Sequence, residues 1–520
     1  MRVRADLSGR RLIVALILIA LLPGILAVAA VSYQRPELPP GPAAYNPRPL
    51  PVVPILMSIQ TRELRRSHSL SSGPLPSSVQ LTGPTFPDVL PTIVLAPREK
   101  PYRLEELRER LPSAFGQVGN ATLLRTSIEA PTGTHLIIDA VQTPDVRLMS
   151  SAQGFVTIIS RGGEIDIAGT PDQVLRLTSW DEERQANDTN PDDGRSFILS
   201  QGGRMDITRA DIGYLGFGAS GTSSGIAWRG EPAGHGSPAA PAHGDVTASS
   251  LHHNWFGAYT FEAKNMRWAH NTFAHNDAYG FDPHDLSNDF IVEQNVAYEN
   301  GRHGFIFSRG CDRNIMRDNV AFRNRGHGFM IDDGRSEDAE LAAARYLPSN
   351  DNQIVNNHAY DNDGSGVEIE GGTGNVVKHN LFERNHVGVR IKDGASAAIT
   401  GNEISHNRMF GVDVLEGAGD VSVTGNRVTG GWASIALGEA GGARLAGNVL
   451  EDASTPLVVA GQTVRDDTIT MIIARFFKWN PLLILWTAIL GVPAVFGATR
   501  LVSYVLRRRR GSRRVRPSLS

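Results

Sequence analysis

Residues 271–329 read NTFAHNDAYGFDPHDLSNDFIVEQNVAYENGRHGFIFSRGCDRNIMRDNVAFRNRGHGF. The stretch repeats one pattern three times: an Asn, a short apolar run, a second Asn, and a Gly-Phe pair that opens an apolar strand. The leading Asn residues are spaced by 24, 24, 38, 23, 22, 24 and 22 residues, and they are Asn271, Asn295, Asn319, Asn357, Asn380, Asn402, Asn426 and Asn448. A period in the low twenties, with short strands and no long helix, predicts a β-solenoid.

Stacking of the coils gives the repeated residues a structural role. Successive coils of a β-solenoid lie at the strand spacing of about 4.8 Å, so equivalent positions stack on one another. We therefore expect the Asn side chains to form hydrogen-bonded ladders and Phe281, Phe305 and Phe329 to stack inside. Leucine-rich repeats have a competing period, but the Leu spacing that they need is absent.

One repeat is longer than the others because residues 332–350 insert a polar loop. This insertion contains a predicted short helical stretch, Glu337 to Tyr346. Insertions in repeat proteins usually lie on the functional face, so the loop marks one face of the solenoid for closer attention.

The composition limits the class of protein. The 520 residues are 41% hydrophobic and include 54 Gly, which fits one large domain or two with frequent turns. The single cysteine, Cys311, excludes an internal disulfide and a Cys-based metal cluster, and we expect it to be a buried apolar residue. The net charge is −3, but residues 507–520 carry +7 and residues 1–11 carry +3, which leaves the rest near −13. An acidic body argues against general nucleic-acid binding.

Two apolar segments predict membrane association. Residues 12–33 and 481–506 each meet the requirement of roughly 20 residues for crossing a bilayer. Arginines lie just before the first segment and just after the second. The positive-inside rule therefore places residues 1–11 and the Arg-rich tail, 507–520, in the cytoplasm. The chain between them is then extracytoplasmic. A cleaved signal peptide ending near Ala27-Val28-Ala29 is the alternative for the first segment.

The sequence between these segments divides into three parts. Residues 34–90 are predicted to be a Pro-rich linker, and residues 91–466 the β-helix with a cap helix near 103–112. Residues 467–480 have the pattern of an interfacial segment. The expected fold is thus all-β, a solenoid flanked by N- and C-terminal transmembrane helices.

Aligning the Gly-Phe pairs of three coils brings polar residues together. Asp282-Pro283-His284-Asp285 then lies beside Ile306-Phe307-Ser308-Arg309 and Met330-Ile331-Asp332-Asp333. If the Phe residues point inward, strict alternation sends Asp282 and His284 outward and Pro283 inward. Arg309 is expected one coil from Asp285, and Asp333 one coil further.

The segment Tyr279-Gly280-Phe281-Asp282-Pro283-His284-Asp285 resembles the signature of the mannuronan C5-epimerases. The Asn-rich coils and Ser308-Arg309 extend the resemblance to roughly residues 245–450. It implies a right-handed parallel β-helix and an isomerase that acts on a uronic-acid polysaccharide such as alginate, without a cofactor. No acidic Gly-rich calcium nonapeptide repeat is present, and we predict no metal site.

The resemblance and the chemistry together suggest roles for five catalytic candidates. Epimerisation at C5 removes a proton next to a carboxylate and returns one to the opposite face of the sugar. His284 is the expected base and Arg309 the expected partner of the substrate carboxylate. Tyr279, or a water that it holds, would supply the returning proton, although a structural stacking role is also open because His occupies the matching place in the next two coils. Asp282 and Asp285 would orient and tune His284 and Arg309.

Further residues of the same coils are candidates for substrate binding. Their cationic members could form a basic groove for an anionic chain inside an acidic body, although about half of them would simply be solvated. The full set is Arg302, His303, Arg313, Arg323, Arg325, His327, Asp332 and Asp333. Asp332, Asp333 and Glu337 could hold a cation, but an exposed acidic loop is the favoured interpretation.

Three functions remain open at this point. The first is a C5-epimerase that acts on polymer crossing the membrane, with a polysaccharide synthase or export machinery as a possible partner. The second is a polysaccharide lyase, which begins with the same proton abstraction. The third is a non-catalytic sugar-binding solenoid, because the fold alone proves no activity.

Overall fold

The computed structural model of the chain describes residues 68–70, 92–151, 154–218, 223–231, 240–334, 347–415, 417–438 and 443–459. Apart from Val458 and Val459, these residues belong to one compact unit. The two apolar segments, most of the Pro-rich linker, the interfacial segment, the Arg-rich tail and the stretch 337–346 lie outside the described residues. Within them, no helix has the length and apolar character needed to cross a membrane.

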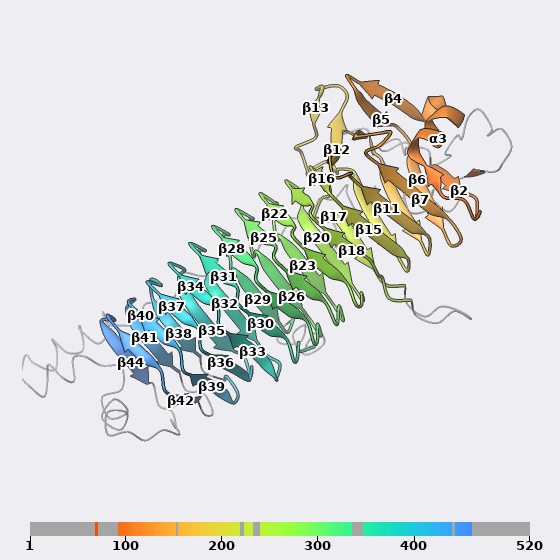
Figure 1. The fold of residues 1–520 in the computed structure, drawn as a ribbon. Coiled ribbons are helices and arrows are strands. Elements are labelled where there is room, and N and C mark those ends of the chain that lie inside the picture. The colour runs from red at the N-terminus through yellow and green to blue at the C-terminus, as the bar shows by residue number, and fades with distance from the viewer. Residues whose placement is uncertain are drawn as a thin grey trace, which may run out of the picture. The chain divides into compact units, whose positions relative to one another are not determined.

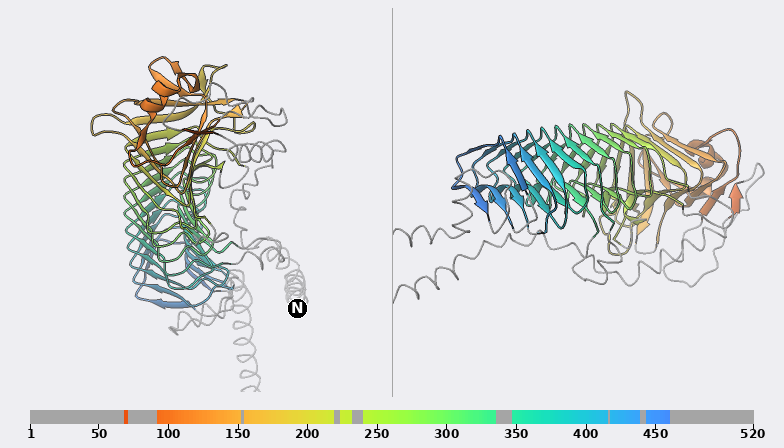
Figure 2. Two further views of the ribbon diagram at one scale, coloured as in Figure 1. Left: turned by 90° about the vertical axis from the view of Figure 1, so that its right-hand side faces the viewer. Right: turned by 90° about the horizontal axis from the view of Figure 1, so that it is seen from below.

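The described strands form three sheets that run along a stack of coils, as Figures 1 and 2 show. Neighbours within each sheet come from successive coils. Sheet 1 contains β1 (His68–Leu70), β2 (Thr92–Leu95), β6 (Ser127–Pro131), β10 (Thr157–Arg161), β14 (Phe197–Gln201), β17 (Gly225–Arg229), β20 (Phe256–Phe261), β23 (Phe281–His284), β26 (Phe305–Ser308), β29 (Phe329–Asp332), β32 (Ser365–Glu370), β35 (Val387–Lys392), β38 (Phe410–Val414), β41 (Ala433–Leu437) and β44 (Thr455–Val459).

The other two sheets complete each coil. Sheet 2 contains β3 (Tyr102–Arg103), β7 (His135–Asp139), β11 (Glu164–Ala168), β15 (Arg204–Thr208), β18 (Asp245–Thr247), β21 (Arg267–Ala269), β24 (Ile291–Glu293), β27 (Ile315–Arg317), β30 (Gln353–Val355), β33 (Asn375–Lys378), β36 (Ala397–Thr400), β39 (Val421–Thr424) and β42 (Ala443–Ala446). Sheet 3 contains β4 (Phe115–Val118), β5 (Ala121–Leu124), β8 (Asp145–Ser151), β12 (Leu175–Asp181), β16 (Ala210–Gly213), β19 (Ser250–His252), β22 (Thr272–Ala274), β25 (Val296–Tyr298), β28 (Val320–Phe322), β31 (His358–Tyr360), β34 (Leu381–Glu383), β37 (Glu403–Ser405), β40 (Arg427–Thr429) and β43 (Val449–Glu451).

Successive coils pair in parallel, which is the defining feature of the predicted β-helix. Antiparallel pairs occur at the N-terminal end, where β4 pairs with β5, β9 (Gly154–Phe155) with β8 and β13 (Ala186–Asn187) with β12. One correction concerns β1, a strand that pairs with β2 although it lies inside the stretch predicted to be a linker. The solenoid therefore recruits a strand from a segment whose proline content suggested a spacer.

The Phe stack has the predicted register. Phe281 pairs with Phe305, and Phe305 pairs with Phe329. All three side chains are fully buried, and the rings of Phe305 and Phe329 stack with 5.2 Å between centroids. Pro283 is buried as predicted, and His284 is partly exposed, but Asp282, which was expected to point outward, is also buried. Cys311 is fully buried, as expected for a small apolar residue.

The Asn ladders are confirmed, and they explain how the coils turn a tight corner. The backbone N–H and the Nδ2 group of Asn295 both donate to Oδ1 of Asn319 at 2.9 Å, and Nδ2 also donates to the carbonyl of Trp268 at 2.9 Å. Equivalent bonds run through a first ladder from Asn271 to Asn448 and a second from Asn276 to Asn407. The residue before each Asn of the first ladder has a left-handed φ, of 59° at His270 and 55° at Gln294. Because that conformation is unfavourable for residues other than Gly, the ladder bonds hold a corner that local preference opposes.

A short helix caps the N-terminal end of the stack, beside β4 and β5 (Figure 1). The helix α3 (Leu104–Arg110) lies within the range predicted for a cap helix, near 103–112, and a 3₁₀ turn, Pro112–Ala114, follows it. Leu104 and Leu107 bury its apolar side. Arg98 pairs with Glu106 of the helix through two hydrogen bonds of 2.7 and 2.6 Å.

Candidate active site

The polar residues of the motif lie on β23 of sheet 1 and in the turns beside it. Strand pairing places Asp282 beside Tyr259 of the preceding coil. It also places His284 beside Ser308, and Ser308 beside Asp332. These side chains come from four successive coils, so the cluster depends on the register of the stack rather than on one loop.

Asp285 joins the two residues expected to carry the chemistry. Its Oδ1 lies 2.8 Å from Nδ1 of His284, and its Oδ2 accepts a hydrogen bond of 3.3 Å from Nη1 of Arg309. An ionised carboxylate only accepts, so Nδ1 of His284 carries the proton and Nε2 is left with a lone pair. The side chains of His284 and Arg309 are 31% and 25% exposed, which leaves both accessible from outside.

The pKa values of this pair are shifted in opposite directions. Burial lowers the pKa of His284, but the hydrogen bond with Asp285 and the charges of Asp282 and Asp332 outweigh it, and the net shift is upward. Burial raises the pKa of Asp285, and the contacts with His284 and Arg309 reverse this to a net decrease. Asp285 is therefore ionised near neutral pH and strengthens His284 as a base.

Asp282 is almost completely buried beside this pair. It is 2% exposed, and its Oδ1 atom has no hydrogen-bond partner among the described residues. Burial raises its pKa to about 6, against the attraction of His284 and Arg302. A carboxyl group in this state can exchange a proton near neutral pH or accept a hydrogen bond from a ligand.

Tyr279 lies just before β23, at the edge of the cluster. Its ring contacts Phe256 at 5.0 Å and stacks on His303 at 5.4 Å between centroids, and the guanidinium of Arg302 lies 5.1 Å from its centroid. Burial raises the pKa of Tyr279, Arg302 opposes this, and the charges of Asp282 and Asp332 add to it. The hydroxyl is therefore protonated at neutral pH and lies within electrostatic range of both carboxylates.

A buried arginine holds the turn that carries Tyr279. Arg195 is 2% exposed and donates from Nη2 to Asp277 at 2.8 Å, from Nε to the carbonyl of Gly216 at 2.7 Å and from Nη1 to the carbonyl of His253 at 3.3 Å. These three acceptors precede β17, β20 and β23. Arg195 thus ties the turns of three successive coils together, and its partner Asp277 lies two residues before Tyr279.

The structure brings only part of the predicted substrate-binding set to this cluster. Arg302, His303, His327, Asp332 and Asp333 lie on the coils of β26 and β29, next to the motif. Arg313 instead precedes β27 and pairs with Asp289 at 2.7 Å, and Arg323 follows β28 and lies 3.5 Å from Glu299. Arg325 is exposed in the turn before β29. Arg313 thus lies at another corner of the coil, whereas Arg323 and Arg325 lie in the turn that also carries His327.

The acidic residues after β29 differ from the predicted exposed loop. Asp333 is fully buried, and Asp332 accepts hydrogen bonds from Ser308 at 3.1 Å and from the backbone of Gly334 at 2.9 Å. The correction has a physical reason, because the insertion begins after these residues and leaves them within the packed coil. One carboxylate oxygen each of Asp332, Asp333 and Glu370 lies within 4.8 Å of the others, an arrangement that could hold a cation. Lys392 already bonds to Glu370 and supplies positive charge there.

Sequence reasoning missed a charged network on the next coils of the same face. Lys392 lies 3.2 Å from Glu368, and Arg390 lies 3.6 Å from Glu368 and 3.4 Å from Asp413. Although burial opposes ionisation of Glu368, His327, Lys392 and Arg390 lower its pKa to about 2. Burial, only partly offset by Lys392, raises the pKa of Glu370 to about 8. The sequence does contain a pattern from which this network could have been predicted. It is the pair of alternating segments Val367-Glu368-Ile369-Glu370 and Val389-Arg390-Ile391-Lys392, because a 22-residue register sets each acid beside a base.

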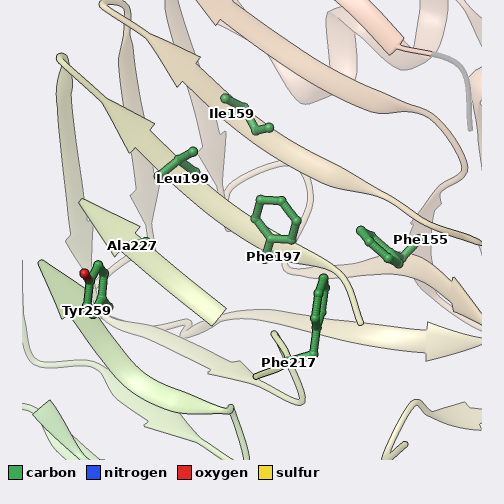
Figure 3. Packing of buried hydrophobic residues seen from close by; sticks show 7 residues of the cluster. All are labelled: Phe155, Ile159, Phe197, Leu199, Phe217, Ala227 and Tyr259. Atoms are coloured by element: carbon green, nitrogen blue, oxygen red, sulfur yellow. The ribbon is translucent and has the colours of Figure 1, made fainter. Parts of the chain in front are cut away.

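The N-terminal side of the cluster is apolar. Figure 3 shows the rings of Phe155, Phe197 and Phe217 gathered over the strands, with Ile159 and Leu199 beside them. Tyr259 ends this group and lies 5.9 Å from the ring of His284. Along sheet 1, His284 thus lies between the aromatic group that ends at Tyr259 and the charged network of Glu368 and Lys392.

Comparisons with known proteins agree with this architecture. The family model described as right handed beta helix region matches residues 222–342, 305–402 and 337–450. A mannuronan C5-epimerase of Pseudomonas putida is 27% identical over 248 residues, which cover 46% of this chain and 40% of that protein. One of Pseudomonas aeruginosa is 28% identical over 213 residues, covering 40% of this chain and 38% of that protein. The matched region thus spans about two fifths of the length of these relatives.

A solved structure shares the fold over a longer range. The periplasmic alginate epimerase AlgG superposes with a TM-score of 0.60 at 19% identity, over 68% of this chain and 83% of that one. At this identity the superposition shows the fold alone. The chain therefore has the fold of a right-handed parallel β-helix, and over part of its length it is similar in sequence to mannuronan C5-epimerases.

Proposed function

We propose that the protein is a polymer-level C5-epimerase that converts mannuronate to guluronate residues in a uronic-acid polysaccharide such as alginate. One observation carries the proposal: Asp285 holds the imidazole of His284 at 2.8 Å and the guanidinium of Arg309 at 3.3 Å. A base and a cation fixed side by side are what proton removal next to a carboxylate requires.

His284 and Arg309 share the first half of the reaction. Nε2 of His284 takes the C5 proton, and the electron pair of the broken C–H bond delocalises into the substrate carboxylate. Arg309 pairs with that carboxylate and balances the added negative charge. Asp285 keeps the imidazole oriented and stabilises the imidazolium that forms.

Tyr279 and Arg302 serve the second half. The Tyr279 hydroxyl delivers its proton to C5 from the opposite face, which forms the new C–H bond and leaves a phenolate. Arg302, 5.1 Å from the ring centroid, stabilises that phenolate. Water then returns a proton to Tyr279 and accepts one from His284, so the protein ends the cycle as it began.

The reaction takes place outside the cytoplasm. Residues 12–33 and 481–506 anchor the chain, and the β-helix between them meets the polymer beside a synthase or export machinery. Two features support this arrangement: the apolar character and flanking arginines of the two segments, and the periplasmic location stated for the solved relative.

The test follows proton exchange and chain cleavage together. The purified protein is incubated with polymannuronate in heavy water, and deuterium at C5 and guluronate content are measured by NMR. His284→Asn should reduce exchange by at least a hundredfold, at the lower end of a general base's contribution. The control is His358→Asn, because His358 is 33% exposed and pairs with Glu383 at 3.0 Å on sheet 3.

Each alternative function has its own outcome in this experiment. Unsaturated chain ends in place of guluronate would identify a lyase that starts with the same abstraction. Binding without any deuterium at C5 would identify a sugar-binding protein. Normal exchange by the His284→Asn protein would show that another group is the base.

A further inference from the structure

Tyr279 is the first ring of a stack that continues away from the reacting centre. The rings of Tyr279 and His303 have an interplanar angle of 24°, and those of His303 and His327 lie 4.7 Å apart at 14°. The three residues occupy the same place before β23, β26 and β29. The stack therefore advances by one coil, about 4.8 Å, per ring along the face proposed to bind polymer.

Backbone hydrogen bonds fix the tautomer of both imidazoles. The N–H of His327 donates to Nδ1 of His303 at 3.0 Å, and the N–H of Ser365 donates to Nδ1 of His327 at 2.8 Å. A backbone N–H can only donate, so each Nδ1 is an acceptor without a proton. In the neutral ring the proton is then on Nε2.

The surroundings keep both rings neutral. Burial and the charges of His327, Arg302 and Lys392 lower the pKa of His303 well below its usual value. Burial lowers the pKa of His327 to about 4; Glu368 opposes this, while Arg390, Lys392 and Arg302 reinforce it. Glu368 itself is held by Ser365, Arg390 and Lys392, at 2.9, 3.6 and 3.2 Å.

The Nε2–H groups are the unused donors of the stack. His303 is 5% exposed, and within the described part of the chain neither Nε2 atom has a hydrogen-bond partner. The His327 side chain is 12% exposed, and neither Nε2 atom is among the buried polar atoms that lack a partner, so both donors can reach a ligand from the surface. The next polar groups along the face, Arg302 and Lys392, influence the charge of both rings and so lie close by.

We propose that His303 and His327 form the subsites for the sugar residues next to the reacting one, each donating its Nε2–H to a hydroxyl or ring oxygen. This inference rests on the proposed function, because Tyr279 marks the reacting sugar. The Nε2–H donors are uncharged, so they can bind sugar oxygens whether or not the sugar unit carries a carboxylate. Arg309 is left to bind the carboxylate of the reacting unit.

A pair of substitutions separates binding from structure. In His327→Asn, the amide oxygen takes the place of Nδ1 and keeps the bond from Ser365, but the Nε2–H donor is lost. In His327→Gln, the side-chain amide reaches the place of Nε2 and keeps a donor, but the Nδ1 acceptor is lost. The same two substitutions are made at His303. Arg313→Gln serves as the control, because Arg313 forms an ion pair with Asp289 at another corner of the coil.

Binding is measured by calorimetry with polymannuronate in a His284→Asn background, so that turnover does not change the ligand. His327→Asn should weaken binding roughly three- to tenfold, the effect of one lost hydrogen bond, while His327→Gln binds within about twofold of the parent. Equal binding by the Asn variant, or an equal loss in both variants, would overturn the proposal. The epimerase assignment is judged separately, by C5 exchange in the wild-type protein. Polymer binding without exchange would refute that assignment but not the proposed subsites. Absence of polymer binding would refute both.

Discussion

At the residue scale, the carboxylate of Asp285 sets both the orientation and the pKa of His284. The hydrogen bond to Nδ1 is the largest of the effects that raise this pKa. The charge on Asp285 also draws Arg309 to the same place. One side chain therefore couples the strength of the base to the position of the cation.

Replacing Asp285 with Asn should move the acid limb of the pH-rate profile to lower pH. The amide oxygen can still accept from Nδ1, but the negative charge that raises the pKa of His284 is gone. A base works only when it is neutral, so a lower pKa extends activity to more acidic solution. We expect a smaller maximal kcat/KM as well, because Arg309 loses its anchor.

The measurement is kcat/KM for C5 exchange between pH 5 and 9, with Asp289→Asn as the matched control because Asp289 pairs with Arg313 away from the site. An acid limb at the wild-type position in the Asp285→Asn protein would mean that a group other than His284 controls the rate.

The sequence was sufficient to predict this cluster but not its extension. His284, Asp285 and Arg309 follow from aligning Gly-Phe pairs 24 residues apart, because a regular period fixes the register. Glu368 and Lys392 did not follow, since the insertion lengthens one repeat to 38 residues and each residue alone resembles an exposed strand charge. Asp333 was predicted to be exposed for a related reason: the sequence does not show where the packed coil ends and the loop begins.

At the element scale, the corner between sheets 2 and 3 is the part of the coil that the Asn ladder controls. Asn319 accepts from the backbone and Nδ2 of Asn295, and its own Nδ2 donates to the carbonyl of Val292 and to Asn357. All of these groups are buried, so removal of one amide leaves several polar atoms without partners.

Asn319→Ala should destabilise the β-helix by roughly 2–4 kcal/mol, the combined cost of two or more unsatisfied buried groups. The matched control is Asn448→Ala, at the half-exposed end of the same ladder, where water can replace the lost amide. Urea unfolding followed by circular dichroism measures both. Equal effects at the two positions would show that the ladder bonds contribute no more than ordinary surface contacts.

The repeat also explains which elements could be predicted. Ladder Asn and stacked Phe residues are periodic from residue 271 onward, and there the strands follow the pattern. The coils before β20 have no such period, and β1 lies within a proline-rich context, so pattern alone could not include it in the stack. Tertiary pairing decided these elements.

At the scale of the β-helix, sheet 1 changes character along its length. It is apolar around Phe197 and Leu199, carries the proposed catalytic pair His284 and Arg309, and is densely charged around Lys392. Buried ion networks of this kind add little stability because desolvation offsets the attraction. Their retention on this one face is consistent with a path for a polar chain that starts at Tyr279 and continues over the histidine stack.

A protein proposed to act on polymer that leaves the cell should remain at the membrane, and the two apolar segments make a prediction that separates their roles. The full-length protein should stay in the membrane fraction after carbonate extraction, since each segment supplies the roughly 20 apolar residues that a span needs.

Ending the chain after residue 466 removes the second span. The shortened protein should still be retained if residues 12–33 form an uncleaved anchor, and should appear in the soluble extracytoplasmic fraction if they are a cleaved signal peptide, with Ala27-Val28-Ala29 near the new N-terminus. Both forms should exchange the C5 proton equally, because the described coils are the same in each. Release of the full-length protein by carbonate would show that neither segment crosses the bilayer.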